Sequence, residues 1–244
     1  MDFVKFDLSV KLLSPIHIGN LTYGFINRTK TYVPYYTMNS AFNYLSFLMF
    51  KETSMKQKLI STSFFFYEKD RLQTPDDLRR KYISSKTSTA IDNSKRVAKE
   101  SQLYNIESIY PKSKDGSDKT IVLKGSIFVS KDFVDKFKAI CQSNLLRIGG
   151  ELKEGHGKVK VELLESNQDS ILNIKQGEYI KELVRIDERS DECIAGNKEI
   201  VFLRKTRSYK KHGGWKWYEG IFFTPFSIAL KDIKIDLITK KVVD

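Results

Sequence analysis

Polar and apolar residues alternate along several stretches of the chain, and this alternation predicts strands with one buried face. The strands predicted in the first two thirds are 3–12, 60–70, 120–130 and 156–165, with a short one at 31–33 that Pro34 ends. Apolar residues recur at helical spacing in 41–51 and in 131–146, which predicts two helices. The N-cap of the first helix is Thr37 or Asn39, and that of the second is Ser130.

The resulting order is strand, helix, strands, strand, helix, strand. This is the order of a β-α-β-β-α-β ferredoxin-like (RRM-like) unit in an α+β fold, and we expect it to cover residues 1–165. Residues 70–119 are polar and crowded with Ser, Thr, Lys and Asp, which predicts a long insertion.

Residues 166–244 carry a weaker, strand-rich pattern. We expect strands within 199–206, 215–230 and 233–239, and one short helix at most, at 180–185. This part is either a β-extension packed on the first domain or a degenerate second ferredoxin-like unit.

The charge of the chain indicates a polyanionic partner. Among 244 residues, 42 Lys and Arg against 30 Asp and Glu give a net charge of +12. The cations cluster in two segments, 78–99 with seven basic residues and one acid, and 204–216 with six basic residues and no acid. We expect both segments in loops or at loop edges.

Other classes of protein are disfavoured. The first residues are charged and alternating, unlike a signal peptide, and the longest apolar run, 41–50, is too short to span a bilayer. Cys141 and Cys193 form neither a disulfide framework nor a zinc site, so a reducing cytoplasm is expected. We expect no membrane association, metal or cofactor.

A glycine-rich loop precedes the strand predicted at 156–165, with Gly149, Gly150, Gly155 and Gly157 among charged residues. No helix follows the loop, and its spacing matches neither a Walker loop nor a dinucleotide fingerprint. Glycine lets backbone N–H groups approach a phosphate closely, so the loop indicates contact with a nucleic-acid backbone. A glycine-rich β-turn without a ligand is the alternative.

Three motifs together resemble the RAMP superfamily of CRISPR proteins. The first is SPIHIGN at 14–20, and the third is the glycine loop within LRIGGELKEGHGKVKVE. The middle motif is similar to the family's stretch that starts with Arg/Lys-Thr-Ala-Ile-Asp and ends with Leu-Tyr-x-x-Glu; its residues here are Thr89, Ala90, Ile91, Asp92, Leu103, Tyr104 and Glu107. The motifs lie in the family's order and span about two thirds of the chain.

Within that family the chain is most similar to the subunit that caps the guide RNA in type III complexes. The serine-then-aromatic segment 60–67 carries this similarity, while Tyr35 and Tyr36 depart from the family's small or acidic residues. Backbone subunits that cut target RNA carry an Asp between the first strand and the first helix, but 15–38 contains no Asp or Glu. A non-cutting backbone-like subunit and the tail-end subunit remain alternatives.

The resemblance implies a non-catalytic subunit of a type III CRISPR ribonucleoprotein in antiviral defence. It would bind the single-stranded 5′ handle of the guide RNA and join the large polymerase-like subunit to the backbone RAMP subunits.

The residues expected at the RNA lie in the three motifs and the two basic segments. They are His17, Asn20, Lys86, Thr87, Lys95, Arg96, Lys99, Arg147, Gly149, Gly150, Lys153, Gly155, His156, Gly157, Lys158, Lys210 and Lys211. Tyr104, Tyr209 and Trp215 lie in or near basic segments and are candidates for stacking on bases.

The alternative activity is that of a metal-independent endoribonuclease that processes the guide precursor. Such relatives cleave with a histidine that acts as a general acid or base. His17 and His156 lie in motifs and are the candidates, although a packed strand-end residue and an exposed turn residue are the simpler interpretations.

Overall fold

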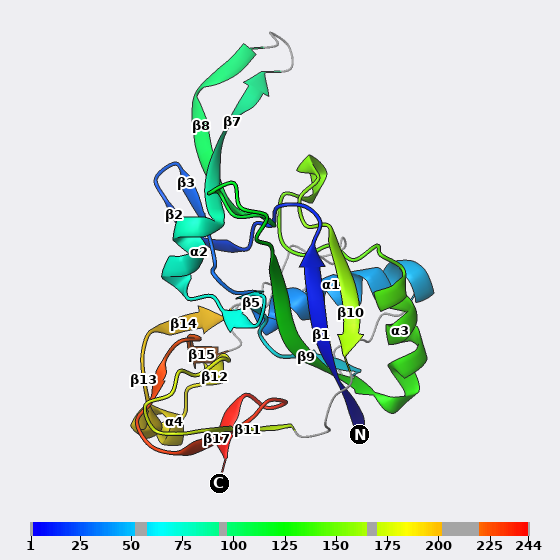
Figure 1. Ribbon diagram of the computed structural model, residues 1–244, viewed down its shortest axis with the longest axis vertical. Coiled ribbons are helices and arrows are strands. Elements are labelled where there is room, and N and C mark those ends of the chain that lie inside the picture. Colours follow the sequence, from blue (N-terminus) through cyan, green and yellow to red (C-terminus); the bar gives the residue numbers. More distant parts are fainter. Residues whose placement is uncertain (1, 52–57, 93–96, 165–169, 202–219, 244) are drawn as a thin grey trace, which may run out of the picture. The chain divides into compact units, whose positions relative to one another are not determined.

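The computed structural model describes residues 2–51, 58–92, 97–164, 170–201 and 220–243 (Figure 1). The chain divides into two compact units, Met1–Ser166 and Asn167–Asp244. The fold is mixed α/β and rich in strands. None of the helices in the described parts of the chain is long and apolar enough to cross a membrane.

Unit 1 is organised around a six-stranded sheet with the order β10-β1-β9-β5-β6, in which β4 also pairs with β9. All the pairs are antiparallel. The strands are β1 (Phe3–Leu12), β4 (Leu59–Ser61), β5 (Phe65–Glu68), β6 (Arg71–Leu72), β9 (Ile121–Ser130) and β10 (Val159–Leu164). The predicted strand 60–70 is therefore wrong as one element. It divides because the Thr62 hydroxyl binds the backbone of Ser126, while Phe64 pairs with Val33.

Two helices cover one face of this sheet, as Figure 1 shows: α1 (Tyr35–Phe50) and α3 (Val134–Gln142). A 3₁₀ turn, Lys131–Phe133, precedes α3. The Phe137 ring joins both layers, with its centroid 5.3 Å from that of Phe6 and 5.4 Å from that of Phe42. Alternate strand residues such as Leu8 and Val10 are fully buried in the same core.

Both helices differ from their predicted bounds. Helix α1 begins at Tyr35, directly after Pro34, whose carbonyl accepts the N–H groups of Thr37 and Met38. The predicted caps Thr37 and Asn39 are wrong, because both lie inside the helix; the Asn39 side chain accepts the N–H of Ser61 at 2.9 Å. Helix α3 ends at Gln142, since Asn144 adopts a left-handed conformation with φ 55°.

A four-stranded sheet with the order β2-β3-β8-β7 completes unit 1. Its strands are β2 (Gly19–Tyr23), β3 (Ile26–Thr29), β7 (Ile83–Asp92) and β8 (Val97–Ile109). Strand β3 runs parallel to β8, and all the other pairs are antiparallel. The β2–β3 hairpin is not among the predicted strands, and the prediction of loops at 78–99 is wrong. That segment instead contains the end of helix α2 (Pro75–Lys81), β7 and the start of β8.

The polar insertion is shorter than the predicted 70–119. Leu78, Tyr82, Ile83 and Ile109 belong to the buried core, so α2 and both ends of the hairpin are anchored there. Thr74 caps α2 by accepting the Asp77 N–H, and the Thr74 hydroxyl bond lowers the pKa of the Asp77 carboxyl. The β7–β8 hairpin extends away from the main sheet, next to the β2–β3 hairpin (Figure 1).

Unit 2 contains short strands around its own core of Ile, Val and Phe side chains. Its strands are β11 (Ile171–Ile174), β12 (Val184–Arg185), β13 (Ile194–Ala195), β14 (Lys198–Val201), β15 (Gly220–Phe223), β16 (Ile228–Ala229), β17 (Ile233–Asp236) and β18 (Lys241–Val243). They form three sheets with the orders β11-β17-β18, β12-β15-β14 and β13-β16.

The predicted helix at 180–185 is wrong. Within the described part of unit 2 the helix is α4 (Glu188–Cys193), which begins where Asp187 and Ser190 bind each other's backbone N–H groups in a capping box. Ile180, Leu183 and Val184 are buried, and the last of them starts strand β12.

A buried ion pair lies in unit 2. Lys240 Nζ is 3.1 Å from Glu182 Oε2, and the side chains are 6% and 0% exposed. The other carboxylate oxygen of Glu182 accepts the N–H of Leu183. Removing one partner from such a pair leaves the other charge buried and uncompensated.

We therefore expect Lys240→Ala to lower the free energy of unfolding of unit 2 by about 3 kcal/mol. Lys241→Ala, which removes the exposed neighbouring lysine, should change it by less than about 0.5 kcal/mol. Urea unfolding of the full chain measures both. Equal effects of the two substitutions would contradict a structural role for the pair.

Candidate nucleic-acid interface

The glycine loop is held against the segment that follows β1. Gly157 N–H donates to the Pro15 carbonyl at 2.9 Å, and Gly150 N–H donates to the His17 carbonyl at 2.8 Å. Within the loop, Gly155 N–H donates to the carbonyl of Leu152. The expectation that glycine N–H groups hold a phosphate is therefore wrong at these three glycines, because each N–H already has a protein acceptor. Contacts of these three glycines with an anion cannot use these N–H groups.

Two glycines are required by close packing. A Cβ on Gly149 (φ +90°) would lie 2.4 Å from the His17 carbonyl oxygen, and one on Gly157 (φ +82°) would lie 2.6 Å from the Ile148 oxygen. Gly155 has φ +86° but faces open space. At Gly150, which has no left-handed φ, the nearest atom to a Cβ would be His17 Cδ2 at 3.5 Å. Only Gly150 therefore tolerates a side chain without strain.

His17 connects the first and middle motifs. Its Nδ1 is 2.7 Å from the Glu107 carbonyl oxygen, an arrangement in which Nδ1–H donates. The Glu107 carboxylate accepts the Thr29 N–H at 3.1 Å and lies 3.5 Å from Arg79. The sequence motifs thus meet in space, and His17 is nearly buried at their junction. His156 is half-buried, and its Nδ1 has no partner among the described residues.

Strand register gathers cations on the sheet face opposite the helices. Lys11 pairs with Lys160, and Arg147 pairs with Lys158, whose carbonyl accepts the Leu13 N–H. The intervening residues of β1 and β10, such as Leu12 and Val159, face the core, so these lysines point the other way.

Lys124 of β9 lies on this same face, opposite Ser9. It forms a 3.0 Å ion pair with Asp70 and lies over the Tyr67 ring. We call Lys11, Lys124, Arg147, Lys158 and Lys160 the basic sheet face; all except the half-buried Lys124 are exposed. Of these five, Arg147 and Lys158 are among the predicted RNA-binding residues. The alternation of Lys and Val in KVKV, which places 158 and 160 on one face, is the signal that points to Lys160 as well.

The remaining predicted residues divide into those that the structure describes and those that lie outside the described ranges. Lys86 of β7 forms a 3.5 Å ion pair with Glu154, which links the hairpin to the glycine loop. Asn20 and Lys153 are exposed, and Tyr104 is half-buried on β8 opposite Ser88. The Thr87 hydroxyl donates to the Asn105 side chain at 2.7 Å. Lys95, Arg96, Tyr209, Lys210, Lys211, Trp215 and the Lys99 side chain lie outside what the structure describes.

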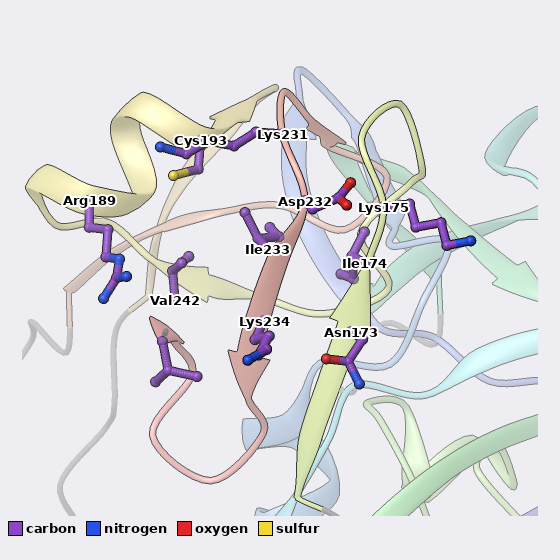
Figure 2. Close-up of a pocket in the computed structure, with 11 residues that line it drawn as sticks. Asn173, Ile174, Lys175, Arg189, Cys193, Lys231, Asp232, Ile233, Lys234 and Val242 are labelled. Carbon is purple, nitrogen blue, oxygen red and sulfur yellow. The ribbon is translucent and has the colours of Figure 1, made fainter.

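Unit 2 contains a separate pocket of about 540 Å³ that α4 and the strands β11, β17 and β18 line (Figure 2). Four cations lie around it, Lys175, Arg189, Lys231 and Lys234, together with Asp232. The Asp232 carboxylate accepts the Gln176 N–H at 2.8 Å. The pocket continues to Val243, the last described residue, at the end of edge strand β18.

Within the described ranges, no three His, Cys, Asp or Glu side chains are placed to hold a metal ion. Cys141 and Cys193 are both buried free thiols. Burial raises the pKa of the Cys141 thiol to about 12, so this group stays protonated at neutral pH.

The fold of this chain occurs in CRISPR complexes. A chain in the cryo-EM structure of the type III-B Cmr-beta complex bound to cognate target RNA and AMPPnP, state 1, matches with a TM-score of 0.59 and 13% identity. That match covers 91% of this chain and 85% of the other. A chain in Cmr-beta bound to cognate target RNA matches with a TM-score of 0.56 and 13% identity, over 98% and 99% of the two chains. No family model and no curated protein matches the sequence.

The packing of the glycine loop gives a prediction of stability. Gly149→Ala should lower the free energy of unfolding of unit 1 by about 2 kcal/mol, because it combines a left-handed φ with a clash against the His17 carbonyl. Gly150→Ala should change it by less than about 0.5 kcal/mol. Thermal and urea unfolding compare the two. A Gly149→Ala protein as stable as Gly150→Ala would mean that the loop is not packed as described.

Proposed function

We propose that the chain is a non-catalytic RNA-binding subunit of a type III CRISPR effector complex. The basic sheet face carries this proposal, because it is continuous with the glycine loop at the Arg147–Lys158 pair. The chain shares its fold with chains of Cmr-beta complexes, and this likeness supports the assignment to such a complex.

The topology of unit 1 supports the narrower assignment to a ferredoxin-like RAMP domain. The sheet order β10-β1-β9-β5, with α1 and α3 on one face, is the order that two β-α-β halves give when they interleave. The β2–β3 and β7–β8 hairpins are then additions at one end of the sheet.

The chemistry of the surface suits a single-stranded polyanion. Guanidinium and ammonium groups bind phosphate oxygens through charge-assisted hydrogen bonds, and the displaced counterions favour the complex. Neighbouring strands lie about 4.8 Å apart, so the cations of Lys11, Lys160 and Arg147 can each reach a different point of one flexible backbone.

The guide RNA's 5′ handle is the single strand that we assign to this surface, with the large polymerase-like subunit and the backbone subunits as neighbours in the complex. The 15–38 segment supports a subunit that does not cut, since it lacks Asp and Glu. In the structure this segment contains the β2–β3 hairpin and the start of α1.

Substitutions on the basic sheet face should weaken RNA binding in a salt-dependent way. Lys158→Ala and Lys160→Ala should each lower the slope of log K against log salt by about 0.7, the value for one phosphate contact on a single strand. Gly150→Val should also weaken binding, because its branched side chain would stand against the His17 ring, in the glycine loop, without a left-handed φ to strain the fold. Filter binding of a labelled single-stranded repeat RNA over a salt series measures these effects.

Lys138→Ala is the matched control, since this exposed lysine lies on α3, on the opposite side of the sheet. If Lys158→Ala and Lys160→Ala bind with the same slope as Lys138→Ala, the RNA does not lie on the basic sheet face.

An endoribonuclease is the second candidate function, and one observation favours it. In the neutral imidazole whose Nδ1–H donates to the Glu107 carbonyl, Nε2 carries the lone pair that a general base needs. Our proposal of a non-catalytic subunit predicts that repeat RNA incubated with the protein in EDTA stays intact. Cleavage that is lost in His17→Ala or His156→Ala would establish the nuclease instead.

A further inference from the structure

An exposed phenylalanine stands at the tip of the β2–β3 hairpin. Phe25 is 57% exposed, whereas the large aromatic side chains of the unit 1 core, such as Phe42 and Phe137, are fully buried. Gly24 precedes it with φ +58°, so the two-residue turn has the Gly-X form of a type II′ hairpin. The second position of such a turn accepts nearly any residue, so the turn itself does not require a ring there.

The tip of this hairpin is held in place. The Phe25 carbonyl accepts the N–H of Asn105 at 2.7 Å, and Ile26 pairs with Asn105 in the parallel β3–β8 ladder. Across the hairpin, the Thr22 hydroxyl donates to the Asn27 side chain at 3.0 Å. An aromatic ring on a fixed turn loses little conformational entropy when it binds a partner.

The surroundings of the tip are suited to a nucleotide. On β8, Leu103 is 57% exposed, and the Asn105 carboxamide, bonded to Thr87, supplies hydrogen-bonding groups. Lys86 precedes Thr87 on the edge strand β7, so its side chain, 63% exposed, points to the face opposite that of Thr87 and Asn105. An exposed ring with a side-chain amide near it, and a cation at the adjoining sheet edge, can bind single-stranded nucleic acid through its bases and backbone together.

We propose that Phe25 is a stacking platform for one base of a single-stranded RNA, and that it lies on the same bound strand as Lys86 and the basic sheet face. This inference rests on the proposed RNA-binding function, and it adds a contact made through a base, whereas the basic sheet face makes contacts through phosphates. The Lys86–Glu154 ion pair connects the two areas, because Glu154 belongs to the glycine loop.

The test uses the full chain and a single-stranded repeat RNA. Phe25→Ala should weaken binding about tenfold, while Phe25→Trp should keep or improve the affinity, because any base can stack on an aromatic face. Phe25→Leu should behave like Phe25→Ala, since it keeps the apolar character but loses the ring. None of the three should change the salt slope, because no phosphate contact is lost. An RNA with 2-aminopurine at successive positions should show stacking-dependent quenching at one position, absent in Phe25→Ala.

Tyr44→Ala is the control, since Tyr44 is 64% exposed on α1 and should leave the affinity unchanged. If Phe25→Ala or Phe25→Leu binds RNA like the unsubstituted protein while Lys158→Ala weakens binding, stacking is wrong and the proposed function stands. If Phe25→Ala retains RNA binding but loses the binding of another subunit of the complex, the ring is a protein contact and the inference is overturned. If the unsubstituted protein binds no RNA, both proposals fail.

Discussion

The backbone pairing between the end of β1 and the glycine loop determines the rest of the candidate interface. The Leu13 N–H donates to the Lys158 carbonyl. The Gly157 N–H donates to the Pro15 carbonyl, and the Gly150 N–H donates to the His17 carbonyl. These bonds fix the register of 147–158 on the end of the main sheet. Because side chains alternate between faces, that register decides which cations face away from the core. A shift by one residue would turn the Lys158 and Lys160 side chains toward the helices and abolish the basic sheet face.

The glycines of the loop make this backbone pairing possible. Gly149 and Gly157 let two chain segments approach to distances that no Cβ permits, and the bonded N–H groups of the loop are used within the protein. The bonds of Gly150 and Gly157 to His17 and Pro15 fix the backbone that carries Arg147 and Lys158, while contact of the loop with RNA stays a prediction. The spacing of the glycines in the sequence is compatible with phosphate contact and with internal packing. The hydrogen bonds of the folded loop show the internal packing.

The sequence predicted elements where the pattern was local, and it failed where the outcome depended on distant partners. The strands at 3–12, 121–130 and 159–164 follow from alternation alone. The start of α1 depends on Pro34, and the division of 60–70 depends on Thr62 meeting Ser126, a contact between separate strands. Lys11 and Lys160 could not be joined from sequence, because their proximity requires the β1–β10 register. The basic segment 204–216 lies outside the described residues, so its predicted role stays a prediction.

The two kinds of contact in our proposal have different consequences for recognition. Lysines and arginines on a sheet face bind any phosphate backbone, so the basic sheet face provides affinity without distinguishing one RNA sequence from another. A ring at Phe25 also accepts any base by stacking, but it fixes where along the strand one base must stand. Under this proposal the glycine loop and the hairpin tip together set the position of the RNA on the protein. Discrimination between sequences then requires hydrogen-bonding groups next to the stacked base, and Asn105, which anchors the Phe25 tip through its N–H, has such a group in its side chain.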